Sequence, residues 1–389
     1  MKICFLVPWI TKGRGGTENV GQMMANAMAA RGHDVHIITF DNMCGPSRWP
    51  LSETITLHHV AEAPGVSGTP QELQLLLTLA SLTPDLVVGL HMNRAFLGYV
   101  RAVRKLGVPL VLSEHQDPQF PARLGTFDPA ERHIAFQSAT RLHLLVDAFL
   151  DTLPAHLRVR ARIIPNTVWP ASTPANPGSK TQGPKTLITV ARLVARKNLR
   201  RLIREFASVA PAHPDWTLRI IGDGPLRAEL EALSTQLDLT ERVVFLGELG
   251  DVYPDLARAH CFVLPSLFEG FPMSSLEAMA HGLPVVGYAA CNGMNVQVEH
   301  GVNGLLAERP LELGGLAQAL DQLMGNAQLR RKMGAASLAR YEALYANTVI
   351  SDQWEALFAE AAAEAPSPRL SLEARLEAAL DRVVFGEAL

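Results

Sequence analysis

Two glutamates eight positions apart, Glu269 and Glu277 in the string EGFPMSSLE, are the residues whose spacing points most directly to chemistry. The apolar run 261–265 before them predicts a buried strand, and Pro272 suits the first position of a helix that ends near Gly282. Glu269 then lies in the connecting loop and Glu277 about one turn inside the helix. Unpaired backbone N–H groups of a first helical turn stabilise an anionic diphosphate. Because a carboxylate does not bind phosphate, both glutamates are expected to bind hydroxyls, and the string predicts a sugar-nucleotide site.

Two cations, Arg192 and Lys197, follow a predicted strand over 186–190. From a strand-to-helix turn they could neutralise a diphosphate leaving group. Arginine offers a planar fork of donors and lysine a compact charge, and both bind more strongly as negative charge builds on the phosphate. The other basic side chains of this segment are interpreted as a solvated turn: Arg196, Arg200 and Arg201.

Composition excludes several classes of function. The chain has 389 residues, 48% of them hydrophobic, which suffices for two domains with separate cores. A net charge of -3 gives no overall positive field, so nucleic acid is not expected as a partner. The four cysteines have neither metal-ligand nor redox spacing, and neither a metal nor another cofactor is expected.

The same features favour a cytoplasmic protein. The N-terminal apolar run is short and contains Pro8, which predicts a buried strand and not a signal peptide. No apolar stretch approaches the ~20 residues needed to span a bilayer. Any action on lipid is therefore expected from the membrane surface.

Strand-like and helix-like segments alternate through both halves of the chain, which predicts an α/β fold with parallel sheets. The expected strands of the first half are 2–8, 34–39, 86–90, 109–113, 141–145 and 161–165. Those of the second half are 186–190, 217–221, 242–246, 261–264 and 284–288. The segment 167–184 is rich in Pro and Gly and predicts an interdomain linker, and the chain from Leu311 onward is expected to be helical.

Glycine-rich turns and strand-end histidines give weaker signals. Gly15 and Gly16 follow the first strand, where glycines let backbone N–H groups approach a ligand, although packing explains such a turn equally well. Glu18 replaces the third glycine of the dinucleotide fingerprint, so that motif is excluded. His115 and His91 each end a predicted strand, and a satisfied structural histidine is the alternative to a ligand contact.

The glutamate string, with Arg192 and Lys197 upstream of it, resembles the retaining glycosyltransferases of family 4 over nearly the whole chain. The resemblance implies the GT-B fold, in which two Rossmann-like domains have parallel sheets facing a central cleft. Ala191 stands where the family usually has glycine, a departure that removes no functional group. The implied organisation is an N-terminal acceptor domain over 1–168, a linker over 169–184, a C-terminal donor domain over 185–345, and helices over 346–389 that cross back to the N-terminal domain.

The resemblance also implies residue roles. Glu269 would hold hydroxyls of the donor sugar and Glu277 the ribose, while Arg192 and Lys197 stabilise the departing phosphate. The implied catalytic residues are Arg192, Lys197 and Glu269. The remaining implied donor-binding positions are Gly15 and Gly16, His115 near the transferred sugar or acceptor, Gly247 near the nucleobase, and the helix start Gly270, Phe271, Pro272, Met273 and Ser274.

The implied reaction moves a sugar from a nucleotide diphosphate donor to a hydroxyl of a glycan or lipid-linked acceptor, with retained configuration and no metal. By analogy with related proteins, the expected pathway is cell-envelope polysaccharide or glycolipid biosynthesis. Two alternatives remain open. One is a GT-B nucleotide-sugar epimerase, which would lack the spaced glutamates with the two cations. The other is a catalytically inactive nucleotide-sugar-binding subunit.

A predicted helix over 93–106 carries Arg101, Arg104 and Lys105 within about one turn. Such a cluster could make peripheral contact with anionic lipid at the inner face of the plasma membrane. A solvated helix face explains the pattern equally well.

Overall fold

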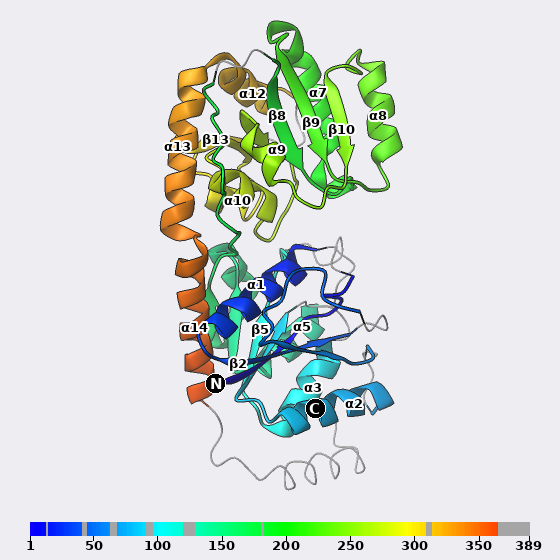
Figure 1. Cartoon of the computed structure of the whole chain (residues 1–389), viewed down its shortest axis with the longest axis vertical. Coiled ribbons are helices and arrows are strands. Elements are labelled where there is room, and N and C mark those ends of the chain that lie inside the picture. The colour runs from blue at the N-terminus through cyan, green and yellow to red at the C-terminus, as the bar shows by residue number, and fades with distance from the viewer. Residues whose placement is uncertain are drawn as a thin grey trace. The chain divides into compact units, whose positions relative to one another are not determined.

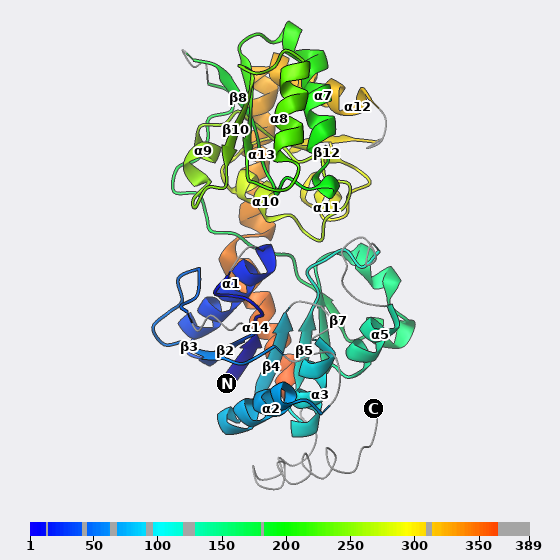
Figure 2. The same ribbon diagram turned by 90° about the vertical axis from the view of Figure 1, so that its right-hand side faces the viewer.

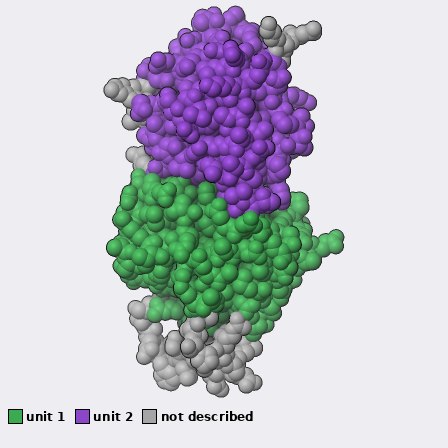
Figure 3. All heavy atoms as spheres, turned by 90° about the vertical axis from the view of Figure 1, so that its left-hand side faces the viewer, with its two compact units in different colours: residues 1–165, 351–389 green, residues 166–350 purple. Residues whose placement is uncertain are grey.

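The computed structural model describes residues 1–12, 15–40, 45–62, 68–90, 96–119, 129–179, 183–308 and 313–364 (Figure 1). The chain forms two compact units, which Figure 3 colours separately. Unit 1 consists of Met1–Pro165 and Ser351–Leu389, and unit 2 of Asn166–Ile350. Each unit contains one parallel sheet with helices against it, which confirms the predicted α/β class with two Rossmann-like domains.

Unit 1 is built on a seven-stranded sheet of order β3-β2-β1-β4-β5-β6-β7. The strands are β1 Lys2–Leu6, β2 Asp34–Thr39, β3 Thr56–His59, β4 Leu86–Leu90, β5 Leu110–Ser113, β6 Arg141–Leu144 and β7 Ala161–Ile163. Helices α1 (Gly16–Ala30) and α14 (Asn347–Ala363) lie on one face, and α2 (Pro70–Leu82) and α3 (Phe96–Leu106) on the other (Figures 1 and 2). Strands β4 and β5 are buried along their whole length, as parallel strands covered on both faces should be.

Unit 2 is built on a six-stranded sheet of order β10-β9-β8-β11-β12-β13. The strands are β8 Lys185–Val190, β9 Trp216–Ile221, β10 Val243–Gly247, β11 Cys261–Val263, β12 Val285–Tyr288 and β13 Gly304–Ala307. Helices α7 (Leu199–Val209) and α8 (Arg227–Gln236) lie on one side of this sheet and α13 (Ala327–Leu344) on the other (Figure 1). The strand order reverses between β8 and β11, and ligands of open parallel sheets bind at the carboxyl ends of the strands beside such a reversal.

The remaining helices are short apart from α12 and α5. They are α5 Pro129–Gln137, α6 Ala155–Arg158, α9 Tyr253–Ala257, α10 Met273–Ala280, α11 Met294–Gln297 and α12 Gly315–Gly325. Three single 3-10 turns accompany them: η1 Asp147–Thr152, η2 Ala195–Lys197 and η3 Ala210–Ala212.

Helix α12 is capped at both ends by buried side chains of other helices. The carboxylate of Glu205 on α7 accepts hydrogen bonds from the backbone N–H groups of Gly314 and Ala317, both at 3.0 Å. At the other end, the guanidinium of Arg330 on α13 donates to the carbonyls of Leu323 and Met324, at 2.6 and 3.0 Å. An anion at the N-terminus and a cation at the C-terminus both complement the helix dipole.

The last described helix, α14, begins in unit 2 and belongs to unit 1 from Ser351 onward. Phe358 packs edge to face against Phe5 of β1 with ring centroids 5.9 Å apart. Arg31, at the end of α1, forms salt bridges with Glu355 at 2.9 Å and Asp352 at 2.6 Å. The core of unit 1 therefore includes side chains from both ends of the described chain.

The sequence analysis did not predict two of the strands, β3 and β13. Both lie at sheet edges. β3 has the sequence TLHH and no fully buried residue, so it lacks the apolar run of a central strand. β13 has the sequence GLLA, begins at a glycine, and follows a turn. Edge strands need only one neighbour and one covered face, so hydrophobic runs do not mark them.

The segment expected to be an interdomain linker packs on unit 2 where it is described. The amide of Ala175 donates to the carbonyl of His281 at 2.8 Å, and Arg330 donates to the carbonyl of Pro177 at 2.7 Å. Gly178 lies against Arg331, which a Cβ would approach to 2.8 Å. Residues 166–179 are therefore an ordered edge of unit 2.

Two of the three basic side chains expected to cluster on α3 pair with one buried carboxylate within unit 1. Arg101 and Lys105 lie 3.4 and 3.2 Å from the buried carboxylate of Glu72 on α2, and only Arg104 of the three is exposed. Glu72 also accepts from the amide of Gly68, while the hydroxyl of Thr69 caps the amide of Glu72. Arg101 and Lys105 are thus partly buried and paired, and Arg104 is the exposed member of the cluster. Among the described residues, no helix is long and apolar enough to cross a bilayer.

Replacing the capping carboxylate should destabilise unit 2. We expect Glu205→Ala to lower the free energy of unfolding by about 2 kcal/mol, because two backbone donors lose a buried acceptor. Urea denaturation followed by circular dichroism measures the change. Glu229→Ala is the matched control, because Glu229 is an exposed glutamate paired with Arg200 on the surface and should cost under about 0.5 kcal/mol. Equal effects for the two variants would show that the cap does not stabilise α12.

Candidate functional site

The loop after β8 carries the predicted cations, and glycines of the next turn hold it in place. Gly222 has φ +126° and lies so close to Ala191 that a Cβ would come within 2.0 Å of that residue's carbonyl oxygen. A Cβ on Gly224 would come within 2.9 Å of three backbone atoms of Leu193. Side chains at either glycine would push the β8 loop away. The turn thus has a structural role, which is to allow the β8 loop to pack against it.

The loop after β11 is tied to the same place. The amide of Leu267 donates to the carbonyl of Arg196 at 2.9 Å, which joins the two loops at the carboxyl ends of neighbouring strands. Asn198 ends the η2 turn in a left-handed conformation, φ 55° and ψ 31°, which asparagine tolerates better than most residues. These contacts bring residues 72 positions apart, Lys197 and Glu269, into direct contact.

Glu269 is the centre of a buried charge cluster. Its Oε1 accepts a hydrogen bond from Nζ of Lys197, and its Oε2 accepts one from Nη1 of Arg196 at 2.9 Å. Glu269 and Lys197 are only 7% and 8% exposed, whereas the Arg196 side chain is 31% exposed. Both carboxylate oxygens therefore have a cationic donor, as a buried charge requires.

The charges of the cluster determine the protonation state of Glu269. Burial acts to raise the pKa of Glu269, but the charges of Lys197 and Arg196 and the lysine hydrogen bond outweigh it and lower that pKa. Burial lowers the pKa of Lys197, with Glu269 opposing the shift. Glu269 is consequently ionised, and its role is that of a fixed anion holding two cations.

The structure changes the assignment of the basic side chains. Arg196, interpreted from sequence as part of a solvated turn, pairs with Glu269. Arg192 is exposed and has no salt bridge among the described residues. The cations that the structure brings together are therefore Lys197 and Arg196, with Arg192 nearby in the chain. Sequence pattern could not separate the three, because the choice depends on the η2 turn.

Buried polar side chains hydrogen-bond to the backbone at the N-terminus of α10. The helix begins at Met273, with Pro272 as its N-cap, one residue later than expected. The hydroxyl of Ser275 and the amide of Gln297 both donate to the carbonyl of Pro272, at 3.1 and 2.9 Å. Asn303 donates to the carbonyl of Gln297 at 3.1 Å and extends the network. The role of Gln297 and Asn303 could not be predicted from the sequence, since isolated amide side chains belong to no recognisable motif.

The preceding residues, Gly270 and Phe271, lie tightly against Gly293. A Cβ on Gly293, whose φ is +77°, would come within 2.6 Å of the carbonyl oxygen of Gly270. Met273 and Ser274, in the first turn of α10, are partly exposed, and no side chain hydrogen-bonds to cap this helix. Its first-turn N–H groups thus remain suited to an anion.

Glu277 lies one turn into α10 and is partly buried. Burial, and secondarily the negative charge of Asp251, raise the pKa of Glu277 to about 8. Its carboxyl group has no hydrogen-bond partner among the described residues. This contrasts with Glu269, so the two glutamates of the string differ in protonation at neutral pH. Asp251, whose charge acts on Glu277, was not singled out from sequence.

Gly247, the expected nucleobase position, ends β10 with φ +73°. Its carbonyl accepts from the amide of Gly222 at 2.7 Å. A Cβ at Gly247 would approach Arg227 to 3.3 Å, so a larger residue there is restricted by its backbone conformation more than by space.

In unit 1, Gly15 is the N-cap of α1 and Gly16 is its first residue. Oε2 of the buried Glu18 lies 2.4 Å from the position of a Cβ on Gly15. An anionic side chain therefore lies beside the turn that was expected to face a phosphate. His91 lies outside the described residues.

His115 belongs to a hydrogen-bonded chain in unit 1. Its Nε2 lies 2.7 Å from Oγ of Ser113, which lies 2.6 Å from Nδ1 of His143. Nε2 of His143 lies 2.7 Å from the carbonyl oxygen of Ile164. Burial lowers the pKa of His143 to about 4, against the bond to Ile164 that acts to raise it, so this ring is neutral near pH 7.

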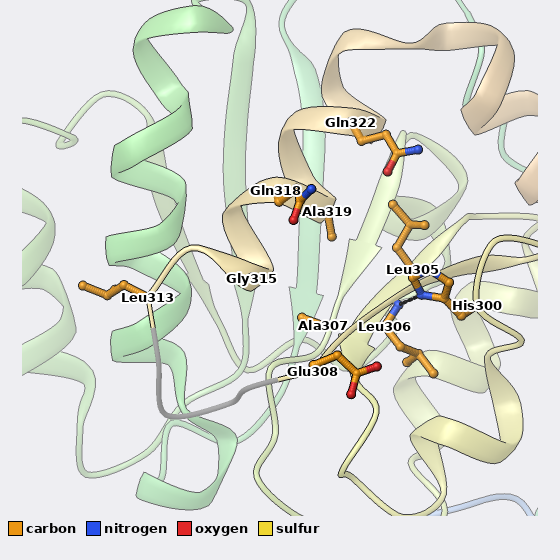
Figure 4. A pocket seen from close by; sticks show the side chains of 10 residues that line it. All are labelled: His300, Leu305, Leu306, Ala307, Glu308, Leu313, Gly315, Gln318, Ala319 and Gln322. Atoms are coloured by element: carbon orange, nitrogen blue, oxygen red, sulfur yellow. Dashed lines mark hydrogen bonds between the residues drawn. The ribbon is translucent and has the colours of Figure 1, made fainter.

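A hollow of about 440 Å³ lies elsewhere in unit 2, between β13 and α12 (Figure 4). His300, Glu308, Gln318 and Gln322 are its polar lining residues. It contains none of the predicted site residues. No group of three or more metal-ligating side chains that could hold a metal ion occurs within the described ranges.

Comparisons with known proteins match both halves of the chain to glycosyltransferase families. The family model "Glycosyl transferase 4-like domain" matches residues 15–167, and "Glycosyl transferases group 1" matches residues 175–340. The chain is 30% identical to an exopolysaccharide phosphotransferase of Streptomyces coelicolor over 100% of its own length, but it spans only 44% of that relative.

Two solved structures resemble nearly the whole chain. Sucrose-phosphate synthase of Thermosynechococcus elongatus has a TM-score of 0.77 at 20% identity, covering 92% of this chain and 98% of that one. HepE of Anabaena in complex with UDP has a TM-score of 0.74 at 20% identity, covering 92% and 100%. These likenesses confirm the GT-B fold.

The protonation of Glu277 should make stability depend on pH. Between pH 4.5 and about 8 the folded protein keeps a proton on Glu277 that the unfolded chain releases, so this contribution is full at low pH and is lost as pH rises through the folded pKa. We expect Glu277→Gln to reduce the loss of stability across this window by roughly 1 kcal/mol per pH unit. Urea unfolding at several pH values tests it, with Glu229→Gln as control. Parallel pH profiles for wild type and Glu277→Gln would contradict the assignment.

Proposed function

The chain belongs to the glycosyltransferases described by these two family models, and from that premise we propose that it is a retaining enzyme transferring a sugar from a nucleoside diphosphate to a hydroxyl of a glycan or lipid-linked acceptor. The observation that carries this proposal is the cluster of Glu269, Lys197 and Arg196 where β8 and β11 end. A carboxylate flanked by two cations, beside a helix N-terminus without a side-chain cap, matches the polarity of a sugar diphosphate.

The proposed division of roles follows from charge. The first-turn N–H groups of α10 and the cations Lys197, Arg196 and Arg192 would bind the diphosphate, and their attraction grows as the leaving phosphate gains charge. Glu269 would accept hydrogen bonds from sugar hydroxyls while holding the cations in position. Glu277 would accept from the ribose hydroxyls. Among the described residues, the remaining donor contacts proposed are backbone groups of Gly247, Gly270 and Phe271.

The state of Glu269 bears on the route by which configuration would be retained. A carboxylate whose two oxygens each accept from a cation is a weak nucleophile, since the two cations draw charge from it, although each oxygen can still accept a further hydrogen bond. A double displacement through Glu269 is therefore disfavoured. We propose instead that the acceptor hydroxyl attacks from the face the phosphate leaves, with the leaving phosphate taking the proton. This mechanism uses no metal.

The finer assignments draw on the relatives. The HepE structure holds UDP, which supports a uridine diphosphate donor here. The Streptomyces coelicolor relative is named for exopolysaccharide, which supports a cell-envelope polysaccharide or glycolipid acceptor, bound through unit 1. A cytoplasmic location is part of the proposal, because the described cysteines Cys4, Cys261 and Cys291 are free thiols. Any peripheral contact of α3 with anionic lipid would rest chiefly on the exposed Arg104, because Arg101 and Lys105 pair with Glu72.

Removing the charge of Glu269 should stop catalysis without unfolding the protein. We expect Glu269→Gln to reduce turnover by on the order of 10²-fold, because the donor sugar loses an orienting acceptor and the two cations lose their fixed anion. Steady-state transfer with UDP-sugars and a polysaccharide-derived acceptor measures it. Glu229→Gln, on the exposed surface, should leave turnover unchanged. Wild-type turnover in Glu269→Gln would remove the cluster from the mechanism.

The stereochemical outcome tests the reaction class. We expect the product to keep the anomeric configuration of the donor, and no conversion of donor when acceptor is omitted. Proton NMR of the new glycosidic linkage gives the first result, and analysis of the sugar nucleotide after incubation gives the second. An inverted linkage excludes the proposed mechanism, and epimerised donor without acceptor identifies the epimerase alternative.

A further inference from the structure

Buried polar side chains of unit 2 form a row of hydrogen bonds that ends at the start of α10. The side-chain amide of Gln297, on α11, donates to the carbonyl of Pro272 at 2.9 Å, and its oxygen accepts from the hydroxyl of Ser275. The side-chain amide of Asn303 donates to the carbonyl of Gln297 at 3.1 Å. The hydroxyl of Ser337, on α13, donates to the carbonyl of Asn303 at 2.8 Å. All four of these side chains are 0% exposed, so the row joins α13 to the N-cap of α10 within the core.

Packing alone does not require polar side chains at these positions. Burying an amide costs free energy unless its donors and acceptors are bonded, and an apolar side chain of similar volume would fill the same space. The amide of Gln297 adds a fixed direction for one backbone group. A helix of eight residues, such as α10, is too short to form stably without tertiary contacts. The orientation of its first turn therefore depends on side chains such as Gln297.

The direction of the Pro272 carbonyl determines the direction of one N–H group. A peptide unit is planar and trans, so the carbonyl of Pro272 and the N–H of Met273 point in opposite directions. Because that carbonyl points at the buried amide of Gln297, the N–H of Met273 points away from it, and Met273 is partly exposed. Pro272 has no N–H of its own. The Met273 N–H is thus the first donor of the α10 N-terminus, and the bond from Gln297 helps to fix its direction.

We propose that Gln297 is a positioning residue for the leaving phosphate, which directs the Met273 N–H at the donor diphosphate by holding the Pro272 carbonyl. Gln297 is fully buried, so it acts only through the backbone of α10. The inference rests on the proposed function, in which the first-turn N–H groups of α10 bind the diphosphate. Their attraction grows as the phosphate gains charge, so a misdirected N–H affects the transition state more than the bound donor.

Steady-state kinetics with the sugar-nucleotide donor test this role. Gln297→Met keeps the length of the side chain and removes its amide. We expect kcat to fall by on the order of 10-fold while the KM for the donor changes by less than about threefold. The matched control is Ser234→Ala, which removes a buried hydroxyl that donates to a carbonyl of α8 at 3.0 Å and should leave kcat unchanged. Equal kcat in the wild type and Gln297→Met overturns the proposal.

A second substitution separates the hydrogen bond from packing. Gln297→Glu has nearly the same shape, but its carboxyl group donates to the Pro272 carbonyl only while it carries a proton, which burial favours. We expect the ratio of its kcat to that of the wild type to be close to one at about pH 6 and to fall as pH rises. Dividing by the wild-type value at each pH removes the titration of other groups. A ratio as low as that of Gln297→Met at every pH overturns the proposal.

Nitrogen-15 NMR of protein labelled at methionine tests the alignment without any donor. The Met273 amide signal is assigned by its loss in Met273→Leu. We expect Gln297→Met to displace this signal and Ser234→Ala to leave it in place. A Met273 signal that Gln297→Met does not move overturns the proposal. Circular dichroism checks that each variant is folded, and Gln297→Glu at high pH replaces Gln297→Met if that variant does not fold.

Addition of UDP to the same labelled protein links the alignment to the ligand. We expect the Met273 amide signal of the wild type to move as UDP binds, and UDP binding that leaves the signal in place overturns the proposal. If the wild-type protein transfers no sugar from any nucleotide donor, the proposed function fails. The spectrum of the ligand-free variants still shows in that case whether Gln297 orients the start of α10.

Discussion

The contact of Glu269 with Lys197 and Arg196 is the interaction on which the organisation of unit 2 depends. It joins two loops from neighbouring strands, and it requires both to end at the same level of the sheet. The glycines at 222, 224 and 293 allow the close backbone approaches that bring these loops together. A buried carboxylate without its cations would be costly, so the loops cannot separate without exposing or neutralising it.

That constraint gives the two glutamates of one short string different chemistry. Glu269 is compensated by cations and ionised, whereas burial and, secondarily, the charge of Asp251 raise the pKa of Glu277, which retains a proton near neutral pH. Glu269 is an ionised carboxylate next to the side chains of Lys197 and Arg196, whereas Glu277 is a nearly neutral carboxyl group one turn into α10. The two groups are therefore suited to different hydroxyls. The distinction arises from the tertiary surroundings, since the residue type is the same.

The sequence was sufficient to predict the central strands, because their apolar runs can be recognised without tertiary information, and it drew attention to Glu269 through a dense local motif. It was insufficient where a partner lies far along the chain. Arg196 was expected in solvent because its pairing depends on a left-handed turn at Asn198, and the α3 basic residues were expected on the surface because Glu72 lies on another helix. Edge strand β3 has no buried residue, and β13 is only four residues long and begins at a glycine, so neither has the long apolar run that predicts a strand.

The packing of α14 on β1 has a consequence for biosynthesis. Unit 1 begins at the first residue but lacks Trp354 and Phe358, both fully buried, until the chain has passed through all of unit 2. The ribosome must therefore synthesise all of unit 2 before unit 1 can complete its core. During that interval Phe5 and its neighbours lack their final cover, so unit 1 is the part most exposed to aggregation or chaperone binding while the chain is made.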